Sequence, residues 1–380
     1  MIEGANKKEV FDAADKAEAA PNANGKSFDQ FVLPEPFFKY ELNVEDFIDT
    51  SSNQVSFLEA INLTLKEEFR RNPKTFLWGQ DVGKGGVFNV VKGMPQEFGK
   101  ERVFNAPIAE DCIVGTANGF CRFDKEARVV VEGAEFADYF WPAMEQLVEC
   151  SHDYWRTKGQ FSPNIVIRLA SGGYIQGGLY HSQNLEAVFT TLPGIRVVCP
   201  SFADDAAGLL RNAIRSEGVT LFLEPKFVYN YKGAYAHFPN ENYFVPFGKA
   251  RIVKSGTSLT IVTYGNATHV TLNALKELEK NYISPEIIDL RSLAPWDKET
   301  VFKSVEKTGR ALVVHEDKVF GGFGGEIAST ISDEMFKFLD APVRRIGSKN
   351  TPVGFAKSYE NEILLSVKDV IDAATSLMKY

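Results

Sequence analysis

Two runs of β-branched residues, Arg128-Val-Val-Val-Glu132 and Asn164-Ile-Val-Ile-Arg-Leu169, decide the fold class of this chain. Neither run alternates strictly between apolar and polar residues, so each predicted strand needs a cover on both faces. The segment between them, residues 138–156, is suited to a helix. A strand, a helix and a strand in this order are typical of a parallel sheet with helices on both sides.

The same alternation continues in both directions along the chain. Before and after the two central runs, strands are predicted at 75–79, 195–199 and 219–223, and helices at 108–121 and 202–216. A second series follows the polar stretch 229–243, with strands predicted at 258–264, 285–290, 311–315 and 342–346 and helices at 267–280, 298–308, 325–338 and 363–378. The sequence therefore predicts an α/β fold made of two parallel-sheet sandwiches, in domains spanning 51–235 and 245–380.

Residues 1–50 carry few signals of order. A short helix is predicted near 7–20, and Pro21-Asn22-Ala23-Asn24-Gly25 and Pro34-Glu35-Pro36 follow it. Proline and glycine at this density are typical of a linker, so we expect an N-terminal extension or linker. Phe57, Ile61 and Leu65, spaced four residues apart, then predict the amphipathic helix that opens the first domain.

Composition excludes several classes of protein. A net charge of −8 and a pI near 5.4 argue against nucleic-acid binding. No run of 18 apolar residues predicts a membrane span, and the four scattered cysteines are expected to be reduced thiols. The first residues show no secretory signal and are too acidic for a transit peptide, so we expect a cytoplasmic location of bacterial type, with the mitochondrial matrix left open.

Glu110 is the first candidate for a functional residue. It follows Pro107-Ile108-Ala109 at a predicted helix start, where the helix dipole favours any carboxylate, so capping alone would explain it. Ile108 and the apolar run Ile113-Val114-Gly115 nevertheless predict partial burial. A buried carboxylate needs a specific partner.

His181 and a group of aromatic residues are the other candidates. His181 lies after a predicted strand, in a loop that also contains four glycines, Gly172, Gly173, Gly177 and Gly178. Loops at the carboxyl ends of parallel strands commonly bind ligands, although a purely structural histidine is the alternative. Phe136 and Tyr139, one helical turn apart, would present two rings on one face with Asp138 off it, or they could simply stack in the core.

Many segments, in order and at matching spacing, resemble the beta subunit of the thiamine-diphosphate-dependent decarboxylating component of 2-oxo acid dehydrogenase complexes. The resemblance covers residues 55–380 and is closer to the branched-chain enzymes than to the pyruvate enzymes. The segments that carry it include Gly79-Gln80-Asp81-Val82, Val103-Phe104-Asn105-Ala106-Pro107-Ile108-Ala109-Glu110, Phe136-Ala137-Asp138-Tyr139, Leu179-Tyr180-His181-Ser182-Gln183, Leu223-Glu224-Pro225-Lys226 and Val314-His315-Glu316-Asp317.

The resemblance implies a thiamine-binding pyrimidine-type domain followed by a transketolase C-terminal domain. Glu110 matches the family glutamate that hydrogen-bonds N1′ of the aminopyrimidine and favours the tautomer that accepts the thiazolium proton. Ile108, Glu135, Phe136 and Tyr139 fall at cofactor-binding positions. His181 matches a histidine near the thiazolium and the mouth of the lipoyl channel, where it would assist acyl transfer.

The resemblance also implies an obligatory partner. The Gly-Asp-Gly…Asn motif that binds Mg²⁺ and the diphosphate is absent from the sequence, so an alpha subunit is expected to hold both in an alpha₂beta₂ assembly with a shared thiamine diphosphate. No metal ligand is expected in this chain. The implied reaction is decarboxylation of a small 2-oxo acid, with branched-chain acids favoured and pyruvate possible, and reductive acylation of a lipoyl group on the dihydrolipoyl acyltransferase core.

Two departures from the family pattern bear on the site. Glu135 stands where branched-chain relatives have a glutamine, which adds a negative charge near the cofactor. Ser216 and Gly218 stand where the potassium-binding loop of those relatives has Asp and Asn, which leaves potassium uncertain.

Two alternatives remain open at this point. The chain could be a fragment of another thiamine enzyme, such as transketolase or deoxyxylulose-phosphate synthase, although those enzymes carry both halves of the site in one chain. It could also be a non-catalytic scaffold subunit, although the presence of Glu110, the paired aromatic residues and His181 argues against that.

Overall fold

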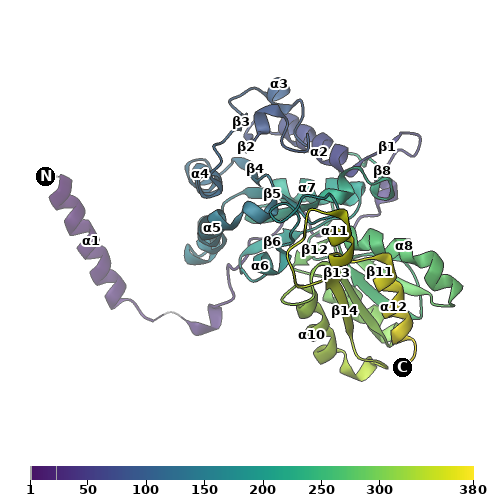
Figure 1. Ribbon diagram of the computed structural model, residues 1–380. Coiled ribbons are helices and arrows are strands. Elements are labelled where there is room, and N and C mark those ends of the chain that lie inside the picture. Colours follow the sequence, from purple (N-terminus) through teal and green to yellow (C-terminus); the bar gives the residue numbers. More distant parts are fainter. Residues whose placement is uncertain (1, 23) are drawn as a thin grey trace.

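The computed structural model describes residues 2–22 and 24–380, so that Met1 and Ala23, the latter in the predicted N-terminal linker, lie outside the described residues. Two sheets dominate the fold, each with helices on both faces (Figure 1). A two-stranded ribbon of β1 (Gln54–Val55) and β8 (Ala236–His237) accompanies them. The predicted α/β fold class is confirmed.

The first sheet has seven strands, six of them parallel. In spatial order they are β12 (Ser292–Ala294), β6 (Ile195–Val198), β7 (Val219–Pro225), β5 (Ile165–Ser171), β4 (Arg128–Ala134), β2 (Thr75–Gly79) and β3 (Val103–Asn105). Val129 and Val131 enter one hydrophobic core and Val130 enters another. Because side chains alternate across a strand and both faces are buried, the central runs contain no regular polar position.

Four helices cover this sheet. They are α4 (Glu110–Phe123) and α5 (Met144–Arg156) on one face and α2 (Phe57–Arg71) and α7 (Ala203–Arg215) on the other. The helix predicted at 138–156 starts later than expected, because two short 3₁₀ turns, the second containing Pro142, precede α5. Two shorter helices are α3 (Met94–Phe98) and α6 (Glu186–Thr190).

The second sheet has five strands. In spatial order they are β14 (Arg344–Ser348), β13 (Ala311–Lys318), β10 (Leu259–Thr263), β11 (Pro285–Asp289) and β9 (Arg251–Lys254). One face packs on α9 (Lys298–Thr308) and α10 (Gly324–Glu334), and the other packs on α8 (Asn266–Lys280) and α12 (Val367–Leu377), which follows α11 (Lys357–Ile363). The sequence predicted a strand that ends at His315, but β13 continues to Lys318, so His315 lies within the strand.

Two edge strands depart from the predicted parallel arrangement. β12 pairs antiparallel with β6, and β9 pairs antiparallel with β11. An edge strand has a neighbour on one side only, so a short segment can join in either direction. β12 also crosses between domains, because it lies between β11 and β13 of the second sheet in sequence but extends the first sheet in space.

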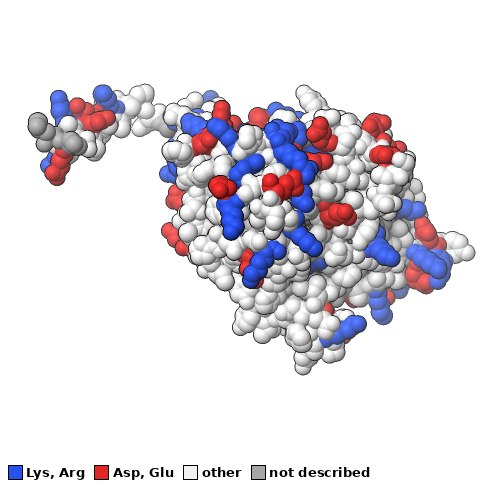
Figure 2. Space-filling model, turned by 90° about the horizontal axis from the view of Figure 1, so that it is seen from above, with Lys and Arg blue, Asp and Glu red and all other residues white. Residues whose placement is uncertain are grey.

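The N-terminal stretch has two parts. Helix α1 (Ile2–Ala19) projects away from the body of the molecule (Figure 1). From Phe28 onward the chain is fastened to the first sandwich, since Trp155 Nε1 donates to the Phe28 carbonyl at 2.8 Å and Asn212 hydrogen-bonds both backbone groups of Phe38 at 3.1 Å. Seen from above, acidic and basic side chains are interspersed both on α1 and on the visible face of the body (Figure 2). No described helix is long and apolar enough to cross a membrane.

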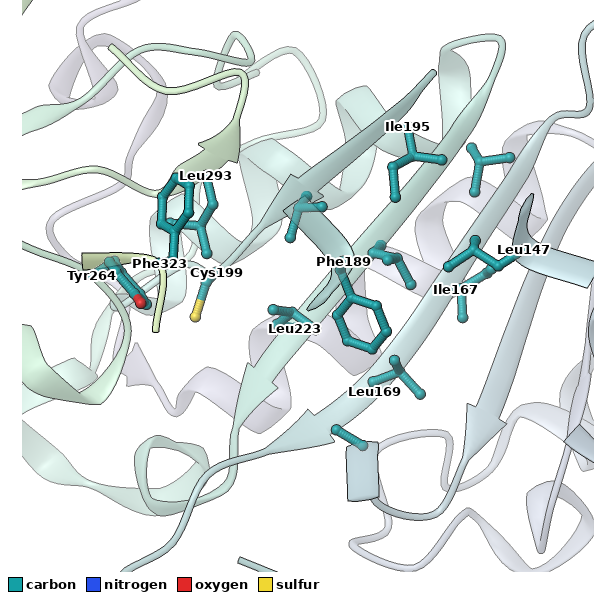
Figure 3. Close-up of a cluster of buried hydrophobic side chains, with 14 of the residues drawn as sticks. Leu147, Ile167, Leu169, Phe189, Ile195, Cys199, Leu223, Tyr264, Leu293 and Phe323 are labelled. Carbon is teal, nitrogen blue, oxygen red and sulfur yellow. The ribbon is translucent and has the colours of Figure 1, made fainter. Parts of the chain in front are cut away.

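The two sandwiches share one hydrophobic core. Tyr264, Leu293 and Phe323 of the second half lie beside Cys199 and Leu223 of the first (Figure 3).

A buried ion network crosses the same boundary. Asp205, on α7 and fully buried, accepts hydrogen bonds from Arg291 at 2.7 Å and from Arg251 at 3.0 Å. These two arginines hold the pKa of Asp205 below its usual value in spite of burial. The carboxylate on the first domain is therefore neutralised by cations that the second domain supplies.

Removal of Arg291 should destabilise the whole chain. In an Arg291→Met variant Asp205 keeps only Arg251, and breaking a buried ion pair costs about 3–5 kcal/mol. Urea unfolding followed by circular dichroism should show this loss in the free energy of unfolding. Lys303→Met, which breaks an exposed pair with Glu299, serves as the control and should change stability by less than about 0.5 kcal/mol. An Arg291→Met variant within about 1 kcal/mol of the wild type would contradict a structural role for the network.

Candidate active site

Glu110 is the first residue of α4 and lies at the edge of the first sheet where the parallel strands end. Its side chain is buried, with 7% exposed, and its Oε1 accepts a hydrogen bond from Gln80 Nε2 at 2.7 Å. Gln80 directly follows β2, which places it at the same edge. The other carboxylate oxygen forms no hydrogen bond with any described residue. Glu110 is thus oriented by one donor and keeps one oxygen for a donor from outside the chain.

His181 lies against the two predicted aromatic side chains. Its ring meets Phe136 edge-on, with ring centroids 4.3 Å apart, and meets Tyr139 in the same manner at 5.5 Å. Phe136 and Tyr139 follow β4, and His181 lies in the loop after β5, so that neighbouring strands bring the three rings together. His181 is half-buried, and its imidazole makes no hydrogen bond to the described residues.

Glu135 interacts electrostatically with both Glu110 and His181. Burial raises the pKa of its carboxyl, and the negative charges of Asp81 and Glu110 raise it further, while His181 opposes the shift. The predicted residues Glu110, Glu135 and His181 therefore share one electrostatic environment. In the described part of the chain, no lysine or arginine forms an ion pair with Glu135.

Ile108 differs from the other predicted residues. It lies in the loop before α4 with 81% of its surface exposed. Leu179 and Tyr180, beside His181, are also largely exposed. An isoleucine at a cofactor site is expected to be covered. In this structure Ile108 is close to Glu110 in sequence, but its side chain is exposed.

Three polar residues near the site were not predicted as site residues. They are Gln80, Glu132 and Lys226, and each lies at or near the carboxyl end of a strand of the first sheet. Gln80 and Lys226 directly follow strands and stand in two of the segments that carry the family resemblance, and these were the signals available for them. Lys226 is buried, its Nζ lies 5.4 Å from the centre of the Phe136 ring, and burial lowers the pKa of its ammonium group.

Glu132 belongs to a buried charge network beneath the site. Arg168 donates to both oxygens of Glu224, at 2.6 and 2.9 Å, and its Nη1 lies 3.6 Å from Glu132 Oε2. A Cβ on Gly86 would lie 2.8 Å from Glu132 Oε1, so only glycine allows this close approach. Because Arg168 forms its two hydrogen bonds with Glu224, it offsets only part of the effect of burial on Glu132. Burial raises the pKa of Glu132 from 4.5 to about 7.

The chain offers poor ligands for metals. No cluster of three or more histidine, cysteine or acidic side chains suited to a metal occurs within residues 2–22 and 24–380. At the expected potassium loop, the Ser216 hydroxyl accepts the Phe37 N–H at 2.9 Å and donates to Asn212 at 3.2 Å. A Cβ on Gly218 would contact Pro34 at 2.8 Å. Ser216 and Gly218 therefore both contact the N-terminal segment.

Comparisons with known proteins assign the two halves of the chain. Residues 53–232 match the transketolase pyrimidine binding domain, and residues 248–370 match the transketolase C-terminal domain. Among solved structures, a split-gene transketolase described as an inactive beta4 tetramer superposes with a TM-score of 0.66 at 22% identity, covering 86% of this chain and 99% of that one. The fold is therefore that of a transketolase-type thiamine-diphosphate protein.

Closer relatives define the family. The chain is 39% identical to the 2-oxoisovalerate dehydrogenase subunit beta of Bacillus subtilis, over 86% of this chain and 99% of that protein. It is 38% identical to the mitochondrial subunit beta 2 of Arabidopsis thaliana, over 89% and 93%. The chain belongs to the family of 2-oxoisovalerate dehydrogenase beta subunits, which confirms the predicted 2-oxo acid dehydrogenase subunit and favours it over the transketolase-fragment and scaffold alternatives. A beta subunit has an alpha subunit as its partner.

The buried Glu132 predicts a specific dependence of stability on pH. Between about pH 4.5 and pH 7 the folded chain keeps a proton on Glu132 that the unfolded chain releases, so stability falls as the pH rises. A shift of this size corresponds to about 3 kcal/mol. A Glu132→Gln variant should lose less stability than the wild type between pH 5 and pH 8, by about this amount, in urea titrations. Glu126→Gln, an exposed control beside Lys74, should follow the wild type; equal slopes for wild type and Glu132→Gln would refute the assignment.

Proposed function

We propose that this chain, together with an alpha subunit, catalyses oxidative decarboxylation of a branched-chain 2-oxo acid such as 2-oxoisovalerate. The acyl group would then pass to a lipoyl group on a dihydrolipoyl acyltransferase core. The observation that supports the proposal most is the buried Glu110 carboxylate, which is oriented by Gln80 and has one oxygen free. Relatives with this activity in their names match nearly the whole folded part of the chain.

Glu110 and the aromatic residues would bind the pyrimidine half of thiamine diphosphate, with Glu135 beside them and Ile108 at the rim. When bound, the cofactor would supply the electron sink that decarboxylation needs. The free oxygen of Glu110 can share a proton with a ring nitrogen, and the N-terminus of α4 favours its charge. Phe136 and Tyr139 would exclude water on one side of the ring.

His181 would serve the second half of the reaction. Its imidazole is half-buried between two ring edges, and it makes no hydrogen bond to the described residues. An imidazole in this state can donate a proton to a sulfur of the lipoyl group as the disulfide is reduced. His181 would thus act on acyl transfer more than on decarboxylation.

The exposed apolar residues around the site support a shared active site. Ile108, Leu179 and Tyr180 are each more than half exposed and lie beside Glu110 and His181 in sequence. Apolar side chains gathered at a site edge mark a surface that a partner covers. We propose that the alpha subunit covers them in an alpha₂beta₂ assembly and holds Mg²⁺ and the diphosphate.

The division of the chain and its location belong to the same proposal. Residues 1–50 would be an extension, 51–235 the pyrimidine-binding domain and 245–380 the C-terminal domain. We place the protein in the cytoplasm, as in bacteria, although relatives include both bacterial and mitochondrial proteins.

A Glu110→Gln variant tests the central residue. Glutamine keeps the shape but cannot accept a proton, so turnover by the reconstituted enzyme should fall by about 10²-fold or more. Assembly with the alpha subunit and the circular dichroism spectrum should be unchanged. Asp111→Asn, the next residue of the same helix turn, is exposed and should retain wild-type activity. Normal turnover by Glu110→Gln would remove Glu110 from the mechanism.

The substrate and the need for a partner are tested by reconstitution. With an alpha subunit, lipoylated acyltransferase and NAD-linked reoxidation, kcat/KM should be higher for 2-oxoisovalerate than for pyruvate or 2-oxoglutarate. The chain without an alpha subunit should show no turnover with any of the three. Turnover by the chain alone would contradict the shared site, and a preference for pyruvate would correct the substrate class.

A further inference from the structure

The loop that carries His181 is held by the C-terminal domain. This loop, residues 172–183, forms most of the connection between β5 and α6. The Gly173 N–H donates to Glu316 Oε1 at 2.6 Å, and the Gln176 N–H donates to Glu360 Oε1 at 3.0 Å.

Two side-chain bonds reinforce this attachment. The Tyr174 hydroxyl donates to the Leu365 carbonyl at 2.7 Å, and Lys318 donates to Gln183 Oε1 at 3.0 Å. The C-terminal domain thus holds both ends of the loop, although it contributes none of the proposed cofactor residues.

Glu316 makes the most constrained of these contacts. It lies in β13 with 4% exposed, and Asn266 donates to its second oxygen at 3.3 Å. A side chain at Gly172, whose φ is +85°, would collide with this carboxylate, so glycine is needed for the contact. A buried carboxylate that accepts a backbone N–H forms one of the stronger hydrogen bonds in a protein. Lys226, also buried, lies close enough to Glu316 to offset part of its charge.

The first domain fixes the same loop from the other side. His181 lies against the Phe136 and Tyr139 rings, and the Gln183 N–H donates to Asp138 Oδ1 at 3.0 Å. A Cβ on Gly177 would lie 2.8 Å from the Cβ of His181, so the loop also packs tightly on itself. The position of the imidazole is therefore set by both domains together.

We propose that Glu316 is a positioning residue for His181, through which the C-terminal domain controls acyl transfer to the lipoyl group. The inference rests on the proposed function, because it concerns the step assigned to His181. Glu316 does not contact the proposed cofactor residues, so decarboxylation should depend on it much less. Misplacement of a reacting group by about 1 Å is enough to lower a rate about 10²-fold.

The test separates the two half-reactions in the assembled alpha₂beta₂ enzyme. Decarboxylation is measured with an artificial electron acceptor, and acyl transfer is measured by reductive acylation of a free lipoyl domain. A Glu316→Ala variant should lose about 10-fold or more in acyl transfer, while decarboxylation and thiamine-diphosphate affinity stay within about 2-fold. Glu316→Gln keeps an acceptor for the Gly173 N–H and should recover most of the loss.

Matched variants exclude a general loss of stability. Glu286→Ala removes another buried carboxylate of the same domain, which pairs with Lys307 and makes no hydrogen bond to the described loop residues, and it should leave the ratio of the two rates unchanged. The double variant Glu316→Ala/His181→Ala should be no worse than His181→Ala in acyl transfer, since both changes act on one group. Tyr174→Phe removes one loop contact without leaving a buried charge. It should lower acyl transfer more than decarboxylation, as Glu316→Ala does, but by a smaller factor.

The outcomes distinguish the inference from the proposed function. If the wild-type enzyme catalyses neither half-reaction, the proposed function fails. If the wild type is active but Glu316→Ala loses both half-reactions in equal proportion, or neither, the inference is overturned and the function stands. If Glu316→Ala does not fold, a Tyr174→Phe variant that loses both half-reactions in equal proportion, or neither, overturns the inference in the same way.

Discussion

The buried ion network of Asp205, Arg251 and Arg291 is the constraint on which the rest of the structure depends. A carboxylate without exposure to solvent is stable only beside cations that are fixed in place. Arg291 is itself fixed, since it also donates to the carbonyls of Lys249 and Ala250 at 2.9 and 3.1 Å. Directly after Arg291, β12 joins the first sheet. The network thus determines where the second domain meets the first, and it leaves little freedom for the two to move separately.

This fixed junction has consequences at the active site. Glu316 and Lys318 can hold the His181 loop only if β13 lies at a set distance from β5. The junction also buries a group of ionisable side chains, among them Glu186, Glu316 and Lys226, and burial raises the pKa of both carboxyls and lowers that of the lysine. Both shifts favour the neutral form, which limits the net charge confined near the cofactor position. Rigidity and charge balance therefore come from the same packing.

The sequence predicted most of the large elements because their signals are local. The unbroken run in β4 and the four-residue spacing in α2 each lie within one element, whereas β12, with three residues, is too short for any period to appear. Contacts in the site between residues far apart in sequence could not be predicted from such local signals. Gln80 and Glu110 are 30 residues apart, and Gly173 and Glu316 are 143 residues apart. Glu110 and His181 could be found from resemblance, but the hydrogen bonds that hold Glu110 and the His181 loop required the fold.

The distribution of burial around Glu110 explains how the proposed half-site can be stable in one chain. Its inner side is closed by Gln80 and by the core beneath α4, so the carboxylate is held whether or not a ligand is present. Ile108, two residues before Glu110, has 81% of its surface in solvent. An exposed isoleucine costs little free energy in a monomer but favours any partner that covers it, at about 25 cal/mol per Å² of apolar surface buried. In the proposed assembly, the surface that leaves the site incomplete would also favour the association that completes it, so that cofactor binding and subunit assembly would be linked equilibria.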